Sequence, residues 1–184
     1  MKSLQGHLLI ATPDLRDPNF SRSVVLMVQH SEQGALGLIL NRPTRAAIEE
    51  VWNQVSQSPC LASGPLHFGG PIQGPLMVLH SRADLAETQV FHGLCFSVQP
   101  DNLEQLISHP PAASMKFFVG YSGWAAGQLE NEMKEGSWRT LTATAELVFG
   151  PSDDLWETVH KQVTTASLQS LLKLKHLPPD PSLN

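Results

Sequence analysis

Short apolar runs separated by turn-forming residues recur along this chain, and most have the length of a β-strand. Residues 23–30 (SVVLMVQH) and 34–41 (GALGLILN) are apolar at nearly every position. They predict a β-hairpin that lies centrally in a sheet and is covered on both faces. Further strands are expected at residues 6–12, 66–70, 76–80, 89–98 (interrupted by Gly93), 115–119 and 140–149.

Patterns with helical period lie between these runs. Thr44 is expected to cap a helix over residues 45–55, and other helices are expected over 101–108, from Trp124 onward and after Asp153. Early hairpins with interspersed helices predict an α+β fold, with a mixed, mainly antiparallel sheet flanked by about four helices. We expect a single domain over residues 1–184, in which 164–184 form a partly irregular C-terminal extension.

The densest grouping of glycine, aromatic and amide residues is Gly120–Trp138, GYSGWAAGQLENEMKEGSW. Gly120 and Gly123 are expected to end the preceding strand, and each permits positive φ or a close backbone approach. With a helix starting at residue 124, Trp124, Gln128 and Glu132 form one polar-aromatic stripe. The adjacent core-facing set is expected to be Ala125, Ala126, Leu129 and Met133.

These residues resemble a known family. Together with GHLLIATPDLRDPNFSRSVVLMVQH near the start, GALGLILNRP after it and FGGPI…LMVLH in the middle, the stretch resembles the AlgH/YqgE family of bacterial proteins. Four motifs occur in the same order, and the resemblance extends to about Trp156. It implies a single cytosolic α+β domain without an established biochemical activity, and a role in transcriptional regulation for one branch. No catalytic residues are implied.

Composition narrows the classes of partner. The net charge is −5, and the arginines are scattered through predicted loops, so direct nucleic-acid binding is not expected. Regulation of transcription would then use a protein partner. The apolar runs are too short to span a bilayer, and the N-terminus does not have the pattern of a secretory signal, so we expect a cytoplasmic protein without membrane contact. We expect a monomer with two free cysteines.

Several kinds of chemistry are disfavoured by spacing. Ser122 resembles a nucleophile elbow, but a GxSxG motif would need glycine where Trp124 stands, and a capping role for Ser122 is preferred. The eight histidines show no metal-binding spacing, and no complete phosphate-binding loop occurs, so no metal and no cofactor are predicted. Asn41 and Arg42 either recognise an anion or hold a turn.

Our leading hypothesis is a binding or regulatory protein with an unknown protein or small-molecule partner. A polar groove is expected to unite Asn41, Arg42, Gly69, Gly70, His80, Trp124, Gln128 and Glu132, with Gly120 and Gly123 as further binding candidates. The alternative is a hydrolase that uses Glu132 or His80 as a general base; no catalytic residue is assigned. A general base should lack a saturating partner, which separates the two hypotheses.

Overall fold

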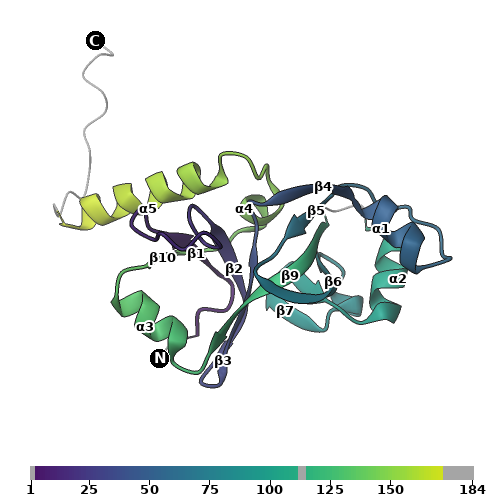
Figure 1. Cartoon of the computed structure of the whole chain (residues 1–184), viewed down its shortest axis with the longest axis horizontal. Coiled ribbons are helices and arrows are strands. Elements are labelled where there is room, and N and C mark those ends of the chain that lie inside the picture. Colours follow the sequence, from purple (N-terminus) through teal and green to yellow (C-terminus); the bar gives the residue numbers. More distant parts are fainter. Residues whose placement is uncertain (1–2, 112–114, 172–184) are drawn as a thin grey trace, which may run out of the picture.

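Ten strands and five α-helices make up the part of the chain that the computed structural model describes, residues 3–111 and 115–171 (Figure 1). The strands are β1 His7–Ala11, β2 Val24–Ser31, β3 Gly34–Ile39, β4 Pro43–Ala47, β5 Pro65–Phe68, β6 Ile72–His80, β7 Thr88–Phe91, β8 Leu94–Ser97, β9 Lys116–Ala125 and β10 Trp138–Thr142. The helices are α1 Ile48–Val55, α2 Pro100–Ser108, α3 Gln128–Lys134, α4 Ala145–Phe149 and α5 Leu155–Leu171, with a short 3-10 helix η1 at Ala83–Leu85.

The sheet is mixed and mainly antiparallel, which confirms the predicted α+β class. Its order is β10-β1-β2-β3-β9-β6-β8-β7; β5 pairs in parallel with β9 and antiparallel with β4. The predicted central hairpin is present as β2 and β3. All five residues from Val24 to Val28 are fully buried, as expected for a strand covered on both faces.

Strand β9 changes neighbours along its length. Its residues 117–119 pair with β5, whereas residues 122–125 pair with β3. Gly120 lies at the change and has a φ of +69°, a conformation that favours glycine. The prediction that Gly120–Gly123 end the strand is therefore wrong: Gly120 redirects the strand, which continues to Ala125. The turn into α3 is at Ala126–Gly127, where Gly127 has a φ of +76°.

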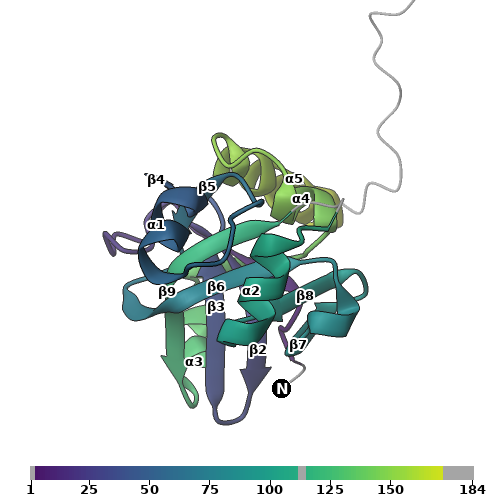
Figure 2. The ribbon, with the colours of Figure 1, turned by 90° about the vertical axis from the view of Figure 1, so that its right-hand side faces the viewer.

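Three clusters of buried apolar side chains form the core. The largest includes Leu26, Phe118 and Trp156 and joins the sheet to α5. A second lies under α1 and α2, which cover the same side of the sheet beside β6 (Figure 2). The third, with Trp124 and Trp138, lies under α3, at the opposite end of the molecule from α1 and α2 in Figure 1.

Other predicted elements also differ from those observed. Residues 43–47 form β4, so α1 begins at Ile48, and the Thr44 hydroxyl accepts from Ala46 N within that strand. The expected strand at 140–149 is the end of β10 followed by α4, because the Thr144 hydroxyl caps a helix by accepting from Leu147 N. Helix α5 continues to Leu171, so the start of the expected C-terminal extension is helical; residues 172–184 lie outside the described part.

Candidate ligand-binding site

Two backbone segments cross in close contact at Gly70 and Gly120. A Cβ on Gly120 would lie 2.6 Å from the carbonyl oxygen of Gly70, and one on Gly70 would lie 2.3 Å from the carbonyl carbon of Tyr121. At Gly69, a Cβ would lie 2.3 Å from the Gly120 oxygen. No side chain fits at these distances, so the three glycines allow β5 and β9 to meet. The structure thus brings together three of the predicted candidates.

A cavity of about 320 Å³ opens beside this crossing. We call it the glycine pocket; it is lined by Phe68, Gly70, Pro71, Ile72, Gln73, Gly74, Val119 and Gly120. Phe68 is 37% exposed and Ile72 is 39% exposed, and they are two of the five large hydrophobic residues that are exposed in the described part. Both therefore face solvent at one concave, mainly apolar site.

A bulge in β6 shapes the pocket. Ile72 pairs with Tyr121 and Leu76 pairs with Val119, so four steps along β6 match two steps along β9. The additional residues bend β6 away from its neighbour. Ile72 packs close to Gly123, where a Cβ would lie 2.8 Å from Cδ1 of Ile72. Gly123 therefore also belongs to this region, because a larger residue there would displace Ile72 from the pocket.

Asn41 and Arg42 lie next to the pocket, but their side chains form hydrogen bonds with backbone groups. The side chain of Asn41 accepts from Val24 N at 2.9 Å and donates to the Arg22 carbonyl at 2.9 Å. Arg42 donates through Nη2 to the Ser21 carbonyl at 3.2 Å, and its own carbonyl accepts from Phe68 N at 2.8 Å. Of the two possibilities for this pair, these bonds favour a turn held by side chains. Burial lowers the pKa of the Arg42 guanidinium, and nearby Asp17 partly offsets this effect.

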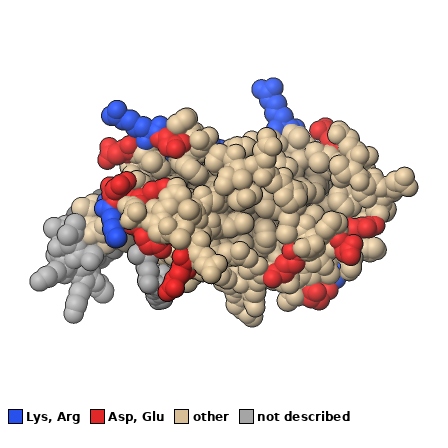
Figure 3. Space-filling model, turned by 60° about the horizontal axis from the view of Figure 1, so that its bottom comes forward, with Lys and Arg blue, Asp and Glu red and all other residues tan. Residues whose placement is uncertain are grey.

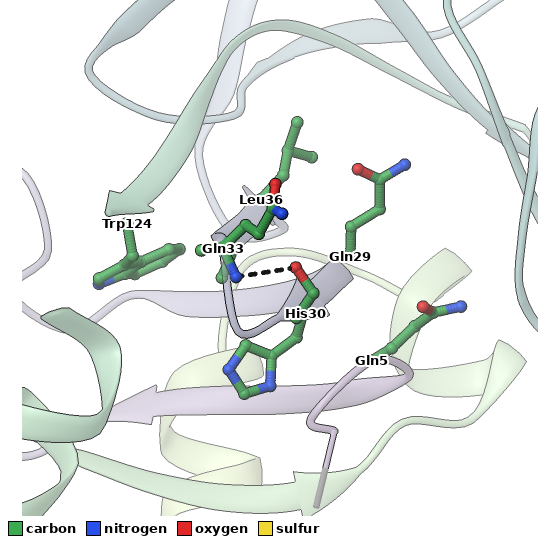
Figure 4. A pocket seen from close by; sticks show the side chains of 9 residues that line it. Gln5, Gln29, His30, Gln33, Leu36 and Trp124 are labelled. Atoms are coloured by element: carbon green, nitrogen blue, oxygen red, sulfur yellow. Dashed lines mark hydrogen bonds between the residues drawn. The ribbon is translucent and has the colours of Figure 1, made fainter. Parts of the chain in front are cut away.

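Trp124 lines a different cavity, of about 480 Å³, at the β2–β3 hairpin (Figure 4). We call it the hairpin pocket; its lining is Gln5, Gln29, His30, Ser31, Gln33, Gly34, Ala35, Leu36 and Trp124. In Figure 4, Trp124 lies at one side and Gln5 at the other, with His30 between them.

Internal hydrogen bonds use much of the polar surface of the hairpin pocket. Gln5 donates to the Gln89 carbonyl at 2.9 Å, and Gln29 donates to the Thr88 hydroxyl at 3.1 Å. His30 accepts from Leu4 N at 2.9 Å through Nδ1, and its Nε2 lies 3.0 Å from a Glu130 oxygen. These groups are less available to a ligand than the exposed side chains of the glycine pocket.

Trp124, Gln128 and Glu132 do come together, although Trp124 ends a strand rather than starting a helix. Oε2 of Glu132 accepts the indole N–H of Trp124 at 2.9 Å and that of Trp138 at 2.8 Å. Gln128 donates to Oε1 of Glu132 at 3.0 Å and accepts from Ala125 N at 3.1 Å. The carboxylate is therefore engaged in binding two buried indoles, which contradicts its use as a general base.

The expected division of residues 124–133 into a polar-aromatic stripe and a core-facing set is also corrected. Trp124 is only 5% exposed and packs in the core, whereas Ala125 and Ala126, expected to face the core, are exposed. Leu129 is buried as predicted. Ser122 is fully buried within β9 and donates to the Gly69 carbonyl at 3.1 Å, so it caps no helix.

His80 is fully buried and lies far from the other candidates. Its Nδ1 accepts from Arg82 N at 3.2 Å, and its Nε2 lies 3.0 Å from the Ser97 hydroxyl, which donates to the Leu85 carbonyl. Burial, followed by the charge of Arg82, lowers the pKa of His80 to about 4. Its neighbour Leu79 pairs with Lys116 at the start of β9. Lys116 lies about 25 Å along that strand from Trp124. The predicted single groove does not form.

Phe68 was missed because apolar residues within a predicted strand are assigned to the core by default, and Ile72 was missed because it falls in the turn expected between the strands at 66–70 and 76–80. The available signal was their place in the FGGPI motif, on either side of two glycines and a proline. Whether any residue of the glycine pocket binds a ligand stays a prediction.

The described residues were also compared with three other kinds of site: charged surfaces, metal centres and membrane spans. On the face shown in Figure 3, charged residues lie mainly toward the two ends, and the stretch between them carries few. Within residues 3–111 and 115–171, no group of three or more His, Cys, Asp or Glu side chains is arranged to hold a metal ion. None of the helices in the described part combines the length and apolar character that a membrane span requires.

Comparison with known proteins gives consistent matches over most of the chain. A family model described as AlgH-like matches residues 8–167. A UPF0301 protein of Chlorobaculum tepidum is 42% identical over 149 residues, which cover 78% of each chain. One from Myxococcus xanthus is 42% identical over 166 residues, covering 86% of this chain and 90% of the relative.

Solved structures agree in fold. The solution structure of the AlgH protein from Pseudomonas aeruginosa superimposes with a TM-score of 0.75 at 30% identity and covers 96% of both chains. A crystal structure of a Corynebacterium diphtheriae protein gives a TM-score of 0.72 at 27% identity, covering 88% of this chain and 87% of that one.

Proposed function

The chain belongs to the AlgH-like family, and from the site described above we propose that it is a binding protein that receives an apolar side chain of a protein partner in the glycine pocket. The single observation that carries this proposal is that Phe68 and Ile72 are both exposed at the same cavity. Exposing two large apolar side chains is unfavourable in water, and their concave arrangement is typical of recognition sites.

The size and lining of the pocket favour a protein partner over a larger cofactor. A volume of about 320 Å³ is at the lower end of the range for ligand sites, and suits one or two side chains. Apart from Gln73, the lining residues have uncharged, non-hydrogen-bonding side chains or no side chain. Polar recognition would then come from backbone groups at the rim, which suits an extended peptide segment.

The rigidity of the pocket supports the same proposal. Gly69 N donates to the Val119 carbonyl at 3.0 Å, and the Gly69 carbonyl accepts from Ile39 N at 2.9 Å and from the Ser122 hydroxyl. The crossing beneath the pocket is thus fixed by hydrogen bonds from two strands, β3 and β9. A preformed site loses little entropy on binding, which favours useful affinity from a small contact area. Participation in transcriptional regulation through such a partner is part of the proposal.

Affinity capture with variants tests the proposal. The full chain is used as bait in bacterial lysate, beside Phe68→Ser/Ile72→Ser and a control, Val55→Ser/Leu61→Ser. Val55 is 71% exposed and Leu61 is 65% exposed, and neither lines the pocket, so the control removes equivalent apolar surface elsewhere. We expect a protein that is retained by the wild type and the control and lost by the pocket variant. Identical sets of captured proteins for all three baits would contradict the proposal.

A further inference from the structure

A second group of reactive side chains lies in the structure, outside the glycine pocket. It comprises Ser152 in the α4–α5 connection, Lys116 at the start of β9 and His67 in β5. The hydroxyl oxygen of Ser152 is 3.3 Å from Nζ of Lys116 and 3.2 Å from Nε2 of His67. It also donates to the Leu40 carbonyl at 3.2 Å. The three side chains come from segments that are 36 or more residues apart in the sequence.

The lysine is unusual because it is buried without a counter-ion. Lys116 is 6% exposed, and none of the ion pairs in the described part of the chain involves it. Burial lowers its pKa to about 8, so a substantial share of the side chain is neutral at mildly alkaline pH. A neutral amine has a lone pair with which to accept the Ser152 proton at this distance, once the hydroxyl turns from the Leu40 carbonyl toward Nζ.

The histidine is buried as well. His67 is 3% exposed, and its Nδ1 makes no hydrogen bond in the described part of the structure, which is unfavourable for a buried polar atom. Burial, and then the charge of Lys116, lower its pKa to about 4, so the ring is neutral near pH 7. The neutral His67 ring can therefore position the Ser152 hydroxyl without adding a second positive charge beside Lys116.

From this geometry we propose that Ser152 is a nucleophile for small acyl esters, with Lys116 as its general base and His67 as a positioning residue. Ser152 lies at a partly exposed position, and the proposal requires a small ester to reach its hydroxyl from the exposed side. This site is independent of the proposed binding function of the glycine pocket. It also differs from the serine first considered, because Ser122 has no basic side chain as a hydrogen-bond partner in the described residues.

The reaction is balanced with water as the only other reactant. The Ser152 oxygen bonds to the ester carbonyl carbon while its proton moves to the Lys116 amine. The C–O bond to the leaving group then breaks, and the ammonium returns the proton to the departing alkoxide, which releases an alcohol and leaves an acyl-serine. In the second half, Lys116 takes a proton from water as the water attacks the acyl carbon. The ammonium then protonates the Ser152 oxygen, and the carboxylic acid is released.

The test uses p-nitrophenyl acetate with the full chain at several pH values. Nitrophenolate release is followed by absorbance, and the acylated residue is identified by peptide mass spectrometry. We expect acetylation of Ser152 with a rate that rises with pH around a midpoint near 8, following Lys116. Lys116→Met should reduce the acylation rate about 100-fold or more and remove that pH dependence.

Two further variants separate the proposed roles from structural effects. Ser152→Ala should abolish the label, whereas Ser122→Ala, which removes another hydroxyl that contacts a backbone carbonyl, should retain it. His67→Gln, which keeps a polar donor, should acylate more slowly than the wild type while keeping the pH midpoint. Absence of label on Ser152 in the folded wild type, or a stable acetyl group on Lys116 in its place, would overturn the proposal.

Discussion

The indole N–H of Trp124 and a carboxylate oxygen of Glu132 lie 2.9 Å apart across the turn from β9 into α3, and Trp138 binds the same oxygen. Removing the carboxylate by Glu132→Ala would leave two buried indole groups without an acceptor. We expect a decrease of about 2 to 4 kcal/mol in the free energy of unfolding, measured by urea denaturation. Glu135→Ala, at an exposed position in the same segment, should change stability by less than about 0.5 kcal/mol. Equal effects of the two variants would contradict the role of Glu132.

The glycine crossing gives a prediction about stability. Gly120→Ala adds a methyl group 2.6 Å from the Gly70 oxygen, in a backbone conformation that disfavours alanine. Backbone strain and steric overlap together should lower the free energy of unfolding by roughly 2 to 5 kcal/mol.

Gly127→Ala is the matched control, because Gly127 has a similar φ but no atom within 4 Å of the added group. It should cost only about 1 to 2 kcal/mol, from strain alone. A melting temperature for Gly120→Ala at or above that of Gly127→Ala would contradict the close crossing.

Local periodicity was sufficient to predict much of this fold, but not the position at which β9 changes its neighbouring strand. The β2–β3 hairpin and α2 followed from apolar runs and a proline pair, whose signals lie within a few residues. The path of β9 through Gly120 depends on pairing with β5 and β3, which are distant in sequence. Gly120 was therefore interpreted as part of a turn, although its positive φ lies where β9 passes from pairing with β5 to pairing with β3.

The candidate sites show the same limit. Gly120 was singled out as a position of positive φ or close backbone approach, and the structure shows both there. The exposure of Phe68 and Ile72 could not be deduced from an apolar pattern. The cluster around Ser152 was missed because its members are brought together only by the tertiary fold. One signal was available: Lys116 alternates with Phe118 in an apolar strand, and two residues with this spacing share one face.

Buried neutral histidines predict that acid destabilises the fold. The folded-state pKa values of His67 and His80 are about 4, below the ordinary value of 6.5. Between these values the unfolded chain binds protons that the folded chain does not, so stability should fall as pH decreases from about 6.5 toward 4. Urea midpoints measured across this range should show a shallower slope for His80→Gln than for the wild type. The exposed His92→Gln is the control and should retain the full slope; a wild-type midpoint that is flat across the range would contradict the burial argument.

Replacing the buried lysine should stabilise the protein at neutral pH. The pKa of Lys116 falls from 10.5 to about 8 on folding, so its contribution to stability increases as pH rises from about 8 to 10.5 and is unfavourable below that window. Lys116→Met avoids burying the charge and should raise the free energy of unfolding at pH 7 by roughly 1 to 3 kcal/mol.

The gain should shrink at pH 10, because this pH is close to the unfolded-state pKa of 10.5 and little free energy is then needed to deprotonate the side chain on folding. The exposed Lys134→Met should have little effect at either pH. A loss of stability for Lys116→Met at pH 7 would indicate that its bond to Ser152 outweighs the cost of burial.

The most direct test of the central claim is the affinity of a peptide for the glycine pocket. Peptides selected from a displayed random library against the wild-type chain are titrated by calorimetry into the wild type, Phe68→Ser and the control Val55→Ser. We predict selected peptides with a shared apolar anchor residue, unchanged affinity for Val55→Ser, and a loss of about 30-fold or more for Phe68→Ser, as expected for a central apolar contact worth about 2 kcal/mol. Selected peptides that bind the wild type and Phe68→Ser equally would contradict the claim.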